Sequence, residues 1–185
     1  SYYLPWHLWP FLEQLERVEI PYNSIHYFDL IRSIFGMPEA VFAYSNGHPK
    51  YPNLSDTKTT AILKYHNNLR CALSLNHCYQ FGSEKQSANV KIEGTEGAVY
   101  ITLGSMLNYP NFEKDKFEIK TKDQDWKTIE LDGNWFPDAF EGTMSNLQRY
   151  IHKEDDVLET SVEDTVNTMK LIDALMKSQN NFYKL

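Results

Sequence analysis

Hydrophobic and polar positions divide the chain into three blocks. In the first block, residues 24–35, the apolar residues recur at helical intervals and gather on one side of a helical wheel: Ile25, Phe28, Ile31, Ile34 and Phe35. Gly36 and Pro38 follow directly, as is typical of a helix C-terminus. The first block therefore predicts an amphipathic helix that ends at Phe35.

The second block, residues 39–131, alternates polar and apolar positions in short runs, which is the pattern of half-buried strands. Its clearest run covers residues 70–79. The other predicted strands are 40–44, 59–65, 88–93, 98–103, 116–120 and 126–131. Asn67-Asn68 and the segment 94–97 are short connections, and they indicate antiparallel neighbours because parallel strands need a longer crossover.

The third block predicts two helices. Pro137 suits a first helical position, and an apolar stripe follows at helical spacing: Phe140, Met144, Leu147 and Ile151. Thr160 and Glu163 fit a capping box ahead of a second stripe over residues 162–176. Because strands are followed by helices rather than alternating with them, we expect an α+β fold with a predominantly antiparallel open sheet and helices on one face. Residues 1–185 are expected to form a single domain.

Composition narrows the class of protein. The chain has 185 residues, of which 42% are hydrophobic, and no apolar run approaches the ~20 residues of a membrane-spanning helix. The formal net charge is −7, and Lys and Arg do not cluster. We therefore expect no membrane and no nucleic-acid partner. Residues 1–10 lack the pattern of a secretion signal, which favours a cytoplasmic location.

The common cofactor and metal motifs are absent from the sequence. No G-x-G-x-x-G follows a predicted strand and opens a helix, and Gly94 and Gly97 lie between two strands, where a hairpin turn explains them. Neither H-E-x-x-H nor a pair of C-x-x-C motifs occurs. We therefore expect that this chain binds neither a dinucleotide nor a metal ion by itself.

A polar stripe lies opposite the apolar side of the first predicted helix. On a regular wheel, Tyr22, His26, Asp29 and Ser33 fall within about 60° of one another. This pattern fits an imidazole that handles a proton and is held by a carboxylate. It equally fits a solvated helix face, or a histidine whose hydrogen bond is satisfied by Asp29. Spacing by itself leaves these interpretations open.

Several segments resemble the Gfo/Idh/MocA oxidoreductases, a family that includes glucose-fructose oxidoreductase and inositol dehydrogenase. The segments are SIHYFDLIR at 24–32 with Gly36, VKIEGTEGA at 90–98, TSVED at 160–164 and TMK at 168–170. The resemblance implies an N-terminal Rossmann domain that binds NAD or NADP and supplies a catalytic lysine. It implies a second, α+β domain that contributes the substrate site and the subunit contacts, and only this second domain is present.

The resemblance also implies roles for residues of the polar stripe. His26 matches the catalytic histidine of the family, and Asp29 matches its substrate-binding acid. The family carboxylate that precedes the histidine by four residues is replaced by Tyr22. A phenol can donate a hydrogen bond to a substrate hydroxyl, but its reference pKa of about 10 makes it a poor general base at neutral pH.

Three further positions are candidate substrate contacts. His77 lies at the end of the clearest strand, and Gln86 leads into the strand at 88–93, where the family can touch substrate. Trp135 lies where the strands give way to the helices and could stack on a sugar ring. Solvated strand ends and an aromatic that fills the core are the alternative interpretations of these positions.

These observations favour the substrate-binding and oligomerisation domain of an NAD(P)-dependent oxidoreductase that acts on a CH–OH group of a sugar or polyol. The expected partners are the substrate, the missing Rossmann domain and further copies of the chain in a homo-dimer or tetramer. A second interpretation keeps the fold but makes the protein a non-catalytic ligand-sensing or protein-interaction module, which Tyr22 favours. A third is a lyase or isomerase that uses His26 and Asp29 without nicotinamide.

Overall fold

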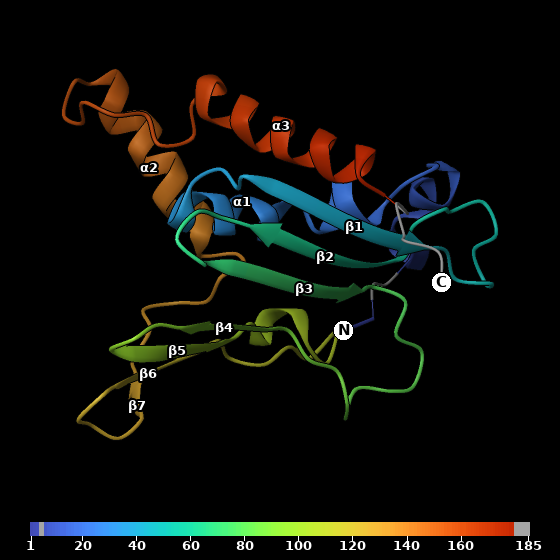
Figure 1. Cartoon of the computed structure of the whole chain (residues 1–185), viewed down its shortest axis with the longest axis horizontal. Helices are drawn as coiled ribbons and strands as arrows, with labels where there is room; N and C mark the ends of the chain where they lie inside the picture. Colours follow the sequence, from blue (N-terminus) through green and yellow to red (C-terminus); the bar gives the residue numbers. More distant parts are fainter. Residues whose placement is uncertain (4–5, 180–185) are drawn as a thin grey trace. The chain divides into compact units, whose positions relative to one another are not determined.

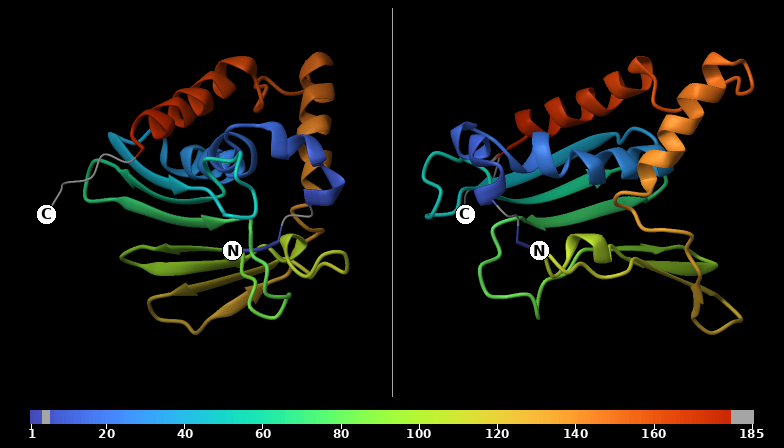
Figure 2. Two further views of the ribbon diagram at one scale, coloured as in Figure 1. Left: turned by 90° about the vertical axis from the view of Figure 1, so that its right-hand side faces the viewer. Right: turned by 180° about the vertical axis from the view of Figure 1, so that it is seen from behind.

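A computed structural model describes residues 1–3 and 6–179, and these form two compact units (Figures 1 and 2). The first unit contains residues 3–78 together with the C-terminal residues from Thr160 on, and the second contains residues 79–159. Each unit has its own antiparallel sheet. The single domain expected over residues 1–185 stays a prediction.

The sheet of the first unit consists of β1 (Ala40–Asn46), β2 (Lys58–Lys64) and β3 (Arg70–Asn76), in that order. Two helices, α1 (Ile25–Phe35) and α3 (Val162–Lys177), cover one of its faces (Figure 1). Asn67 and Asn68 both have positive φ, 58° and 63°, as the tight turn between β2 and β3 requires. Side chains of both helices and of the sheet form one core: Ile20, Phe28, Ile31, Ala43, Ala61, Leu63, Tyr65, Leu171, Ile172 and Leu175.

The N-terminal residues of the first unit form a smaller core. Two 3₁₀ helices, η1 (Trp6–Leu8) and η2 (Pro10–Gln14), precede the π-helical turn η3 (Glu19–Asn23), which leads into α1. Side chains from this segment pack with residues of the β1–β2 connection and the end of β3: Trp6, Leu12, Val18, Tyr51, Leu54 and Cys78. The segment before α1 is thus anchored to the first unit rather than standing apart from it.

The second unit is built on a four-stranded sheet. Its strands are β4 (Asn89–Glu93), β5 (Gly97–Thr102), β6 (Lys116–Thr121) and β7 (Lys127–Ile129), in sequence order, and α2 (Ala139–Ile151) follows. Gly97 is needed at the start of β5, because a Cβ there would lie 2.4 Å from the carbonyl oxygen of Lys120. No helix in the described part of the chain is both long enough and apolar enough to cross a bilayer.

The structure confirms the predicted α+β class with antiparallel strands and an open sheet. The strands, however, divide into two sheets, β1–β2–β3 in the first unit and β4–β5–β6–β7 in the second. The cap of α3 is also shifted by one residue: Ser161, not Thr160, accepts the hydrogen bond from the Asp164 amide. Its side-chain oxygen satisfies one of the amides that a helix start leaves unpaired.

The buried face of α1 differs from the prediction. Ile34 is 51% exposed, whereas Arg32 is 9% exposed and lies inward. The reason is a polar contact with α3: the Arg32 guanidinium bonds both carboxylate oxygens of Asp164. A wheel that sorts residues by polarity puts arginine outside, but a paired guanidinium can lie at a helix interface.

Arg32 and its partners fasten α1 to α3. Besides Asp164, the guanidinium donates to Asp29 Oδ1 at 3.0 Å and, through Nε, to Thr168 Oγ1 at 3.0 Å. The Thr168 hydroxyl in turn donates to Asp29 Oδ1. Arg32 keeps the pKa of Asp164 below its usual value through its hydrogen bonds and its charge. The network therefore orients α1 about its own axis.

We predict that Arg32→Met lowers the melting temperature by about 2–8 °C, because Asp29, Asp164 and Thr168 each lose the hydrogen bonds from the guanidinium and the charges of two carboxylates are no longer neutralised. Thermal unfolding followed by circular dichroism measures the change. Lys177→Met is the matched control, since Lys177 forms an exposed ion pair with Asp173 on α3. Equal effects of the two substitutions would contradict the role assigned to Arg32.

Candidate functional site

Tyr22 and His26 lie on one continuous stretch of helical backbone. The amides of Tyr22 and Asn23 donate to the Val18 carbonyl at 3.2 and 3.1 Å, and the amide of Ser24 donates to the Glu19 carbonyl at 2.7 Å. The Ser24 carbonyl then accepts from the Phe28 amide of α1 at 3.1 Å. Tyr22 therefore lies in the π-helical turn η3, and His26 lies in the first turn of α1. Both residues are exposed and they are four positions apart, and we refer to them as the Tyr22–His26 pair.

A buried polar network supports the turn that carries this pair. The Glu19 carboxylate accepts a hydrogen bond from the Ser24 hydroxyl and lies 2.7 Å from His77 Nδ1. Glu19 and His77 are each 1% exposed, and Ser24 is fully buried. A carboxylate in such a place is stable only if its oxygens are bonded. Glu19 therefore connects the start of α1 to the end of β3.

Asp56 fixes the other end of the same turn. Its Oδ1 accepts hydrogen bonds from the backbone amides of Val18 and Glu19, which the helical ladder leaves without partners. Burial raises the pKa of Asp56 above its usual value, and the backbone hydrogen bonds oppose that shift only in part. The turn is thus held by carboxylates at two places, one from η3 itself and one from the β1–β2 connection.

Asp29 makes a contact with α3 that the helical wheel did not predict. Its Oδ1 accepts three hydrogen bonds, from two nitrogens of Arg32 and from Thr168, which turn the carboxylate toward α3. The Asp29 side chain is still 49% exposed. Ser33, at the far end of the predicted stripe, donates its hydroxyl to the Leu30 carbonyl. The Asp29 carboxylate thus has a structural role in the contact with α3, and its predicted role in substrate binding stays a prediction.

The other three candidates have different surroundings. His77 is buried against Glu19, so a contact with substrate would require an exposure that this structure does not show. Gln86 and Trp135 belong to the second unit. The Gln86 side chain accepts from the Asn108 amide at 3.2 Å, and the Trp135 amide donates to Asp115. Of the six candidates, all of which lie within the described residues, only Tyr22 and His26 are exposed.

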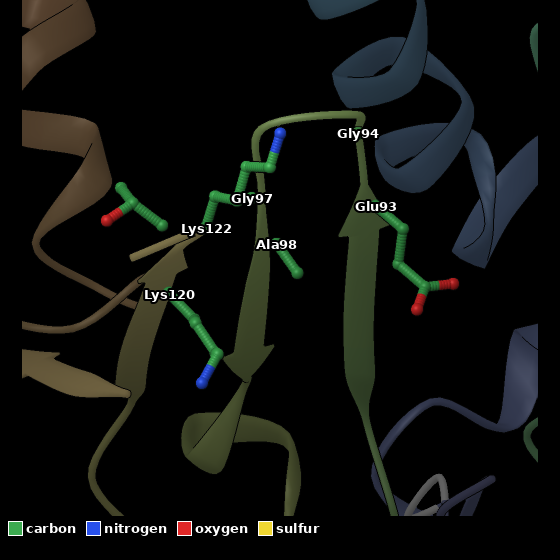
Figure 3. A pocket seen from close by; sticks show the side chains of 7 residues that line it. Glu93, Gly94, Gly97, Ala98, Lys120 and Lys122 are labelled. Atoms are coloured by element: carbon green, nitrogen blue, oxygen red, sulfur yellow. The ribbon is translucent and has the colours of Figure 1, made fainter. Parts of the chain in front are cut away.

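A shallow depression in the second unit contains none of the candidates. It is lined at the β4–β5 turn and along β6 by Glu93, Gly94, Gly97, Ala98, Lys120, Thr121 and Lys122 (Figure 3). Lys120 lies 3.8 Å from Asp125, and the Lys122 amide donates to the Glu96 carbonyl. The close approach of Gly97 to β6 accounts for its shape, and two surface lysines do not make it a site.

Comparison with protein families identifies the domain. A family model described as the C-terminal alpha/beta domain of an oxidoreductase family, Gfo/Idh/MocA, matches residues 20–183. The chain belongs to this family. The match begins at η3 and includes α1, both sheets, α2 and α3. A search of curated proteins finds no match to this sequence.

Solved structures of oxidoreductases share the fold. An oxidoreductase from Agrobacterium radiobacter, in complex with NAD+, L-tartaric acid and magnesium, has a TM-score of 0.75 at 19% identity, over 98% of this chain and 52% of that one. UDP-N-acetylglucosamine 3-dehydrogenase from Acidithiobacillus ferrooxidans has a TM-score of 0.71 at 12% identity, over 98% and 51%. A levoglucosan dehydrogenase in complex with NADH and levoglucosan has a TM-score of 0.69 at 14% identity, over 86% and 47%. This chain spans about half the length of these proteins.

The described residues of this Gfo/Idh/MocA domain contain no strand–turn–helix unit of the kind that holds a dinucleotide. All strand pairs within its two sheets are antiparallel, and no described strand runs through a glycine-rich turn into an α-helix. Such a turn is what presents backbone amides to a pyrophosphate. Over residues 1–3 and 6–179, no cluster of His, Cys, Asp and Glu side chains is arranged to hold a metal ion.

Sequence reasoning missed the residues that support the Tyr22–His26 pair. Glu19 and Asp56 are acidic residues in segments without a clear period, and Ser24 was treated only as part of the helix start. Acids are mostly exposed, so nothing local distinguishes these buried ones. A sequence signal did exist for Ser24, because serine directly before a helical stripe is a frequent first residue of a helix.

We predict that Asp56→Asn removes a pH-dependent loss of stability. Because the pKa of Asp56 is raised in the folded protein, its stabilising effect is complete below the unfolded value, 3.8, and declines as the pH rises through the folded value. Asparagine keeps an oxygen acceptor for the Val18 and Glu19 amides but carries no charge. Urea unfolding measures the free energy of unfolding of both proteins. The value for Asp56→Asn should rise relative to the wild-type value as the pH increases from below 3.8 toward neutrality.

Exposed Asp132→Asn controls for the loss of one surface charge. A difference between wild type and Asp56→Asn that stays constant over this pH range would show that Asp56 does not titrate differently in the folded and unfolded states.

Proposed function

We propose that this chain is the substrate-binding domain of an NAD(P)-dependent oxidoreductase that acts on a CH–OH group of a sugar or polyol. The observation that carries the proposal is the exposed Tyr22–His26 pair on a helical backbone braced by the buried Glu19 network. Family membership supports the reaction class, and the sugar dehydrogenases among the solved structures of the same fold support the substrate class.

The part of this chain in such a reaction is to orient a hydroxyl and to take its proton. Oxidation of a secondary alcohol removes a hydride from carbon and a proton from oxygen, and the hydride chemistry belongs to a nicotinamide held outside this chain. An exposed imidazole is suited to accept the proton near neutral pH. The Tyr22 phenol, about one turn away, can donate a hydrogen bond to a neighbouring hydroxyl of the same substrate.

Asp29 can contribute to substrate binding without breaking its contact with α3. The three hydrogen bonds that hold the carboxylate all end on Oδ1. The side chain is half exposed, which leaves Oδ2 able to accept from a substrate hydroxyl. Gln86 and Trp135 belong to the second unit, and their contact with substrate stays a prediction from the sequence. His77 enters the proposal through Glu19, which it holds in place.

The second candidate function keeps the ligand site without catalysis. Tyr22 occupies the position of the family carboxylate, and a phenol binds a hydroxyl better than it removes a proton. A sensor or protein-interaction module would then use the same surface. Self-association as a dimer or tetramer, and a cytoplasmic location, stay predictions.

With the nicotinamide-binding domain present, we predict that His26→Ala lowers kcat by about 10²- to 10⁴-fold, the share of one general base. The exposed position of His26 means that the melting temperature should barely change. His66→Ala is the matched control, because His66 is an exposed histidine at the β2–β3 turn. Normal turnover by folded His26→Ala would place the proton acceptor in another residue or another domain, whereas no turnover by the wild-type protein would favour the sensor.

We also predict that this chain alone does not bind nicotinamide cofactor, since its described residues offer no amide cradle for a pyrophosphate. Calorimetric titration of the chain with NADH and with NADPH should release no binding heat. Micromolar affinity for either cofactor would place a dinucleotide site in this chain and contradict the proposal that the nicotinamide is held outside it.

A further inference from the structure

Phe11 comes from a segment that the family match does not include. The match begins at residue 20, whereas Phe11 lies in η2, between Trp9 and Leu12. Phe11 is 45% exposed, although a phenylalanine in a short helix beside a core has neighbours to pack against. The adjacent Leu12 does so and is 3% exposed. The segment therefore buries one side chain and presents the next one to solvent.

The segment that carries Phe11 is held in a fixed position. Trp6 is 2% exposed and packs on Tyr51, with ring centroids 4.7 Å apart. The Trp9 amide donates to the Trp6 carbonyl and the Leu12 amide to the Trp9 carbonyl, each at 3.0 Å. Buried anchors thus lie on both sides of Phe11 in the sequence. A binding surface on such a segment is preorganised, which lowers the entropy lost when a ligand binds.

The Phe11 ring reaches the candidate site directly. Its centroid lies 6.0 Å from that of Tyr22, with an interplanar angle of 62°, which is an edge contact. Tyr22 is 46% exposed, so both rings keep open surface. His26 follows Tyr22 by four residues and is exposed as well. An exposed aromatic surface and an exposed imidazole are thus close to each other in the chain, and binding sites combine apolar contact with a few polar groups.

We propose that Phe11 and Tyr22 form an aromatic ledge that binds the C–H face of a neutral sugar ring beside His26. The faces of aromatic rings carry negative charge, which attracts the weakly positive C–H bonds on one face of a pyranose. Phe11 thereby determines specificity for a ring over an open chain, and it does so through a segment outside the family match. The inference rests on the proposed function, since it assigns the substrate class of the same site.

Charge around the ledge favours a neutral ligand over a sugar acid. Glu13 and Glu16 are exposed in the same segment, and Arg17 is engaged by Gln179 at 3.0 Å and by Glu16. The whole chain carries a formal charge of −7. This negative charge would repel an anionic substrate, because Arg17 is already engaged by Gln179 and Glu16.

The test is saturation-transfer NMR and chemical-shift titration of this chain with two probes at millimolar concentration. Levoglucosan is a neutral sugar with a ring, and L-tartrate is an open-chain dianion. We expect levoglucosan to bind through its C–H protons and L-tartrate to bind more weakly. Phe11→Ala should weaken levoglucosan binding about tenfold or more, and Phe11→Leu should weaken it less, because leucine keeps apolar contact but no ring.

The matched control is Phe81→Ala. Phe81 is 85% exposed and makes a similar edge contact with Tyr79, at 5.9 Å, so the substitution removes an equivalent exposed ring elsewhere. Melting temperatures verify that all variants are folded. Equal losses from Phe11→Ala and Phe81→Ala, or no loss from either, would overturn the ledge while leaving the proposed function in place.

Two outcomes separate the ledge from the proposed function. If levoglucosan binding depends on Phe11 but is unchanged in His26→Ala, the ledge stands and the place assigned to the reacting hydroxyl is wrong. If the wild-type chain binds no levoglucosan, or binds L-tartrate more tightly, the ledge as a neutral-sugar site is wrong, and the kcat of His26→Ala then decides the proposed function independently.

Discussion

The candidate site depends on one buried carboxylate. Glu19 bonds the Ser24 hydroxyl at the start of α1 and His77 at the end of β3, all three of them almost fully buried. A buried charge that loses its partners is strongly destabilising, so these contacts are made together or not at all. This requirement fixes the π-helical turn between Glu19 and Ser24. The direction in which Tyr22 and His26 leave the backbone follows from that turn.

Helix α1 carries polar residues on its exposed side and also in its contact with α3, whereas a helical wheel assigns polar residues to the exposed side alone. One side presents His26 to solvent, while another carries Arg32 and Asp29 into the contact with α3. The contact is polar, yet Arg32 is nearly buried, because bidentate pairing with Asp164 offsets the cost of removing the guanidinium from water. The hydrogen bonds of this contact all end on one oxygen of Asp29, and the side chain as a whole is half exposed.

Local patterns predicted the elements well and the site only in part. The two-residue period found all seven strands, and the tight turns at Asn67-Asn68 and at 94–97 predicted their antiparallel pairing. The helical period found α1, α2 and α3. It also put Ile34 inside and Arg32 outside, because residue polarity is a poor guide where a helix packs through an ion pair. Neither the buried Glu19 network nor the contact between Phe11 and Tyr22 has a periodic signature.

The sequence by itself determined the secondary structure, the fold class and the family resemblance, because these depend on spacing between residues close together in the chain. It also predicted that His26 and Tyr22 are exposed polar positions at the start of the first helix, and both are exposed. Tertiary structure alone decided that His77 is buried against Glu19, that Arg32 joins α1 to α3, and that Phe11 reaches Tyr22. Each of these contacts joins residues at least eleven positions apart. Such pairings are selected by packing and by the need to satisfy buried polar groups, neither of which a local pattern records.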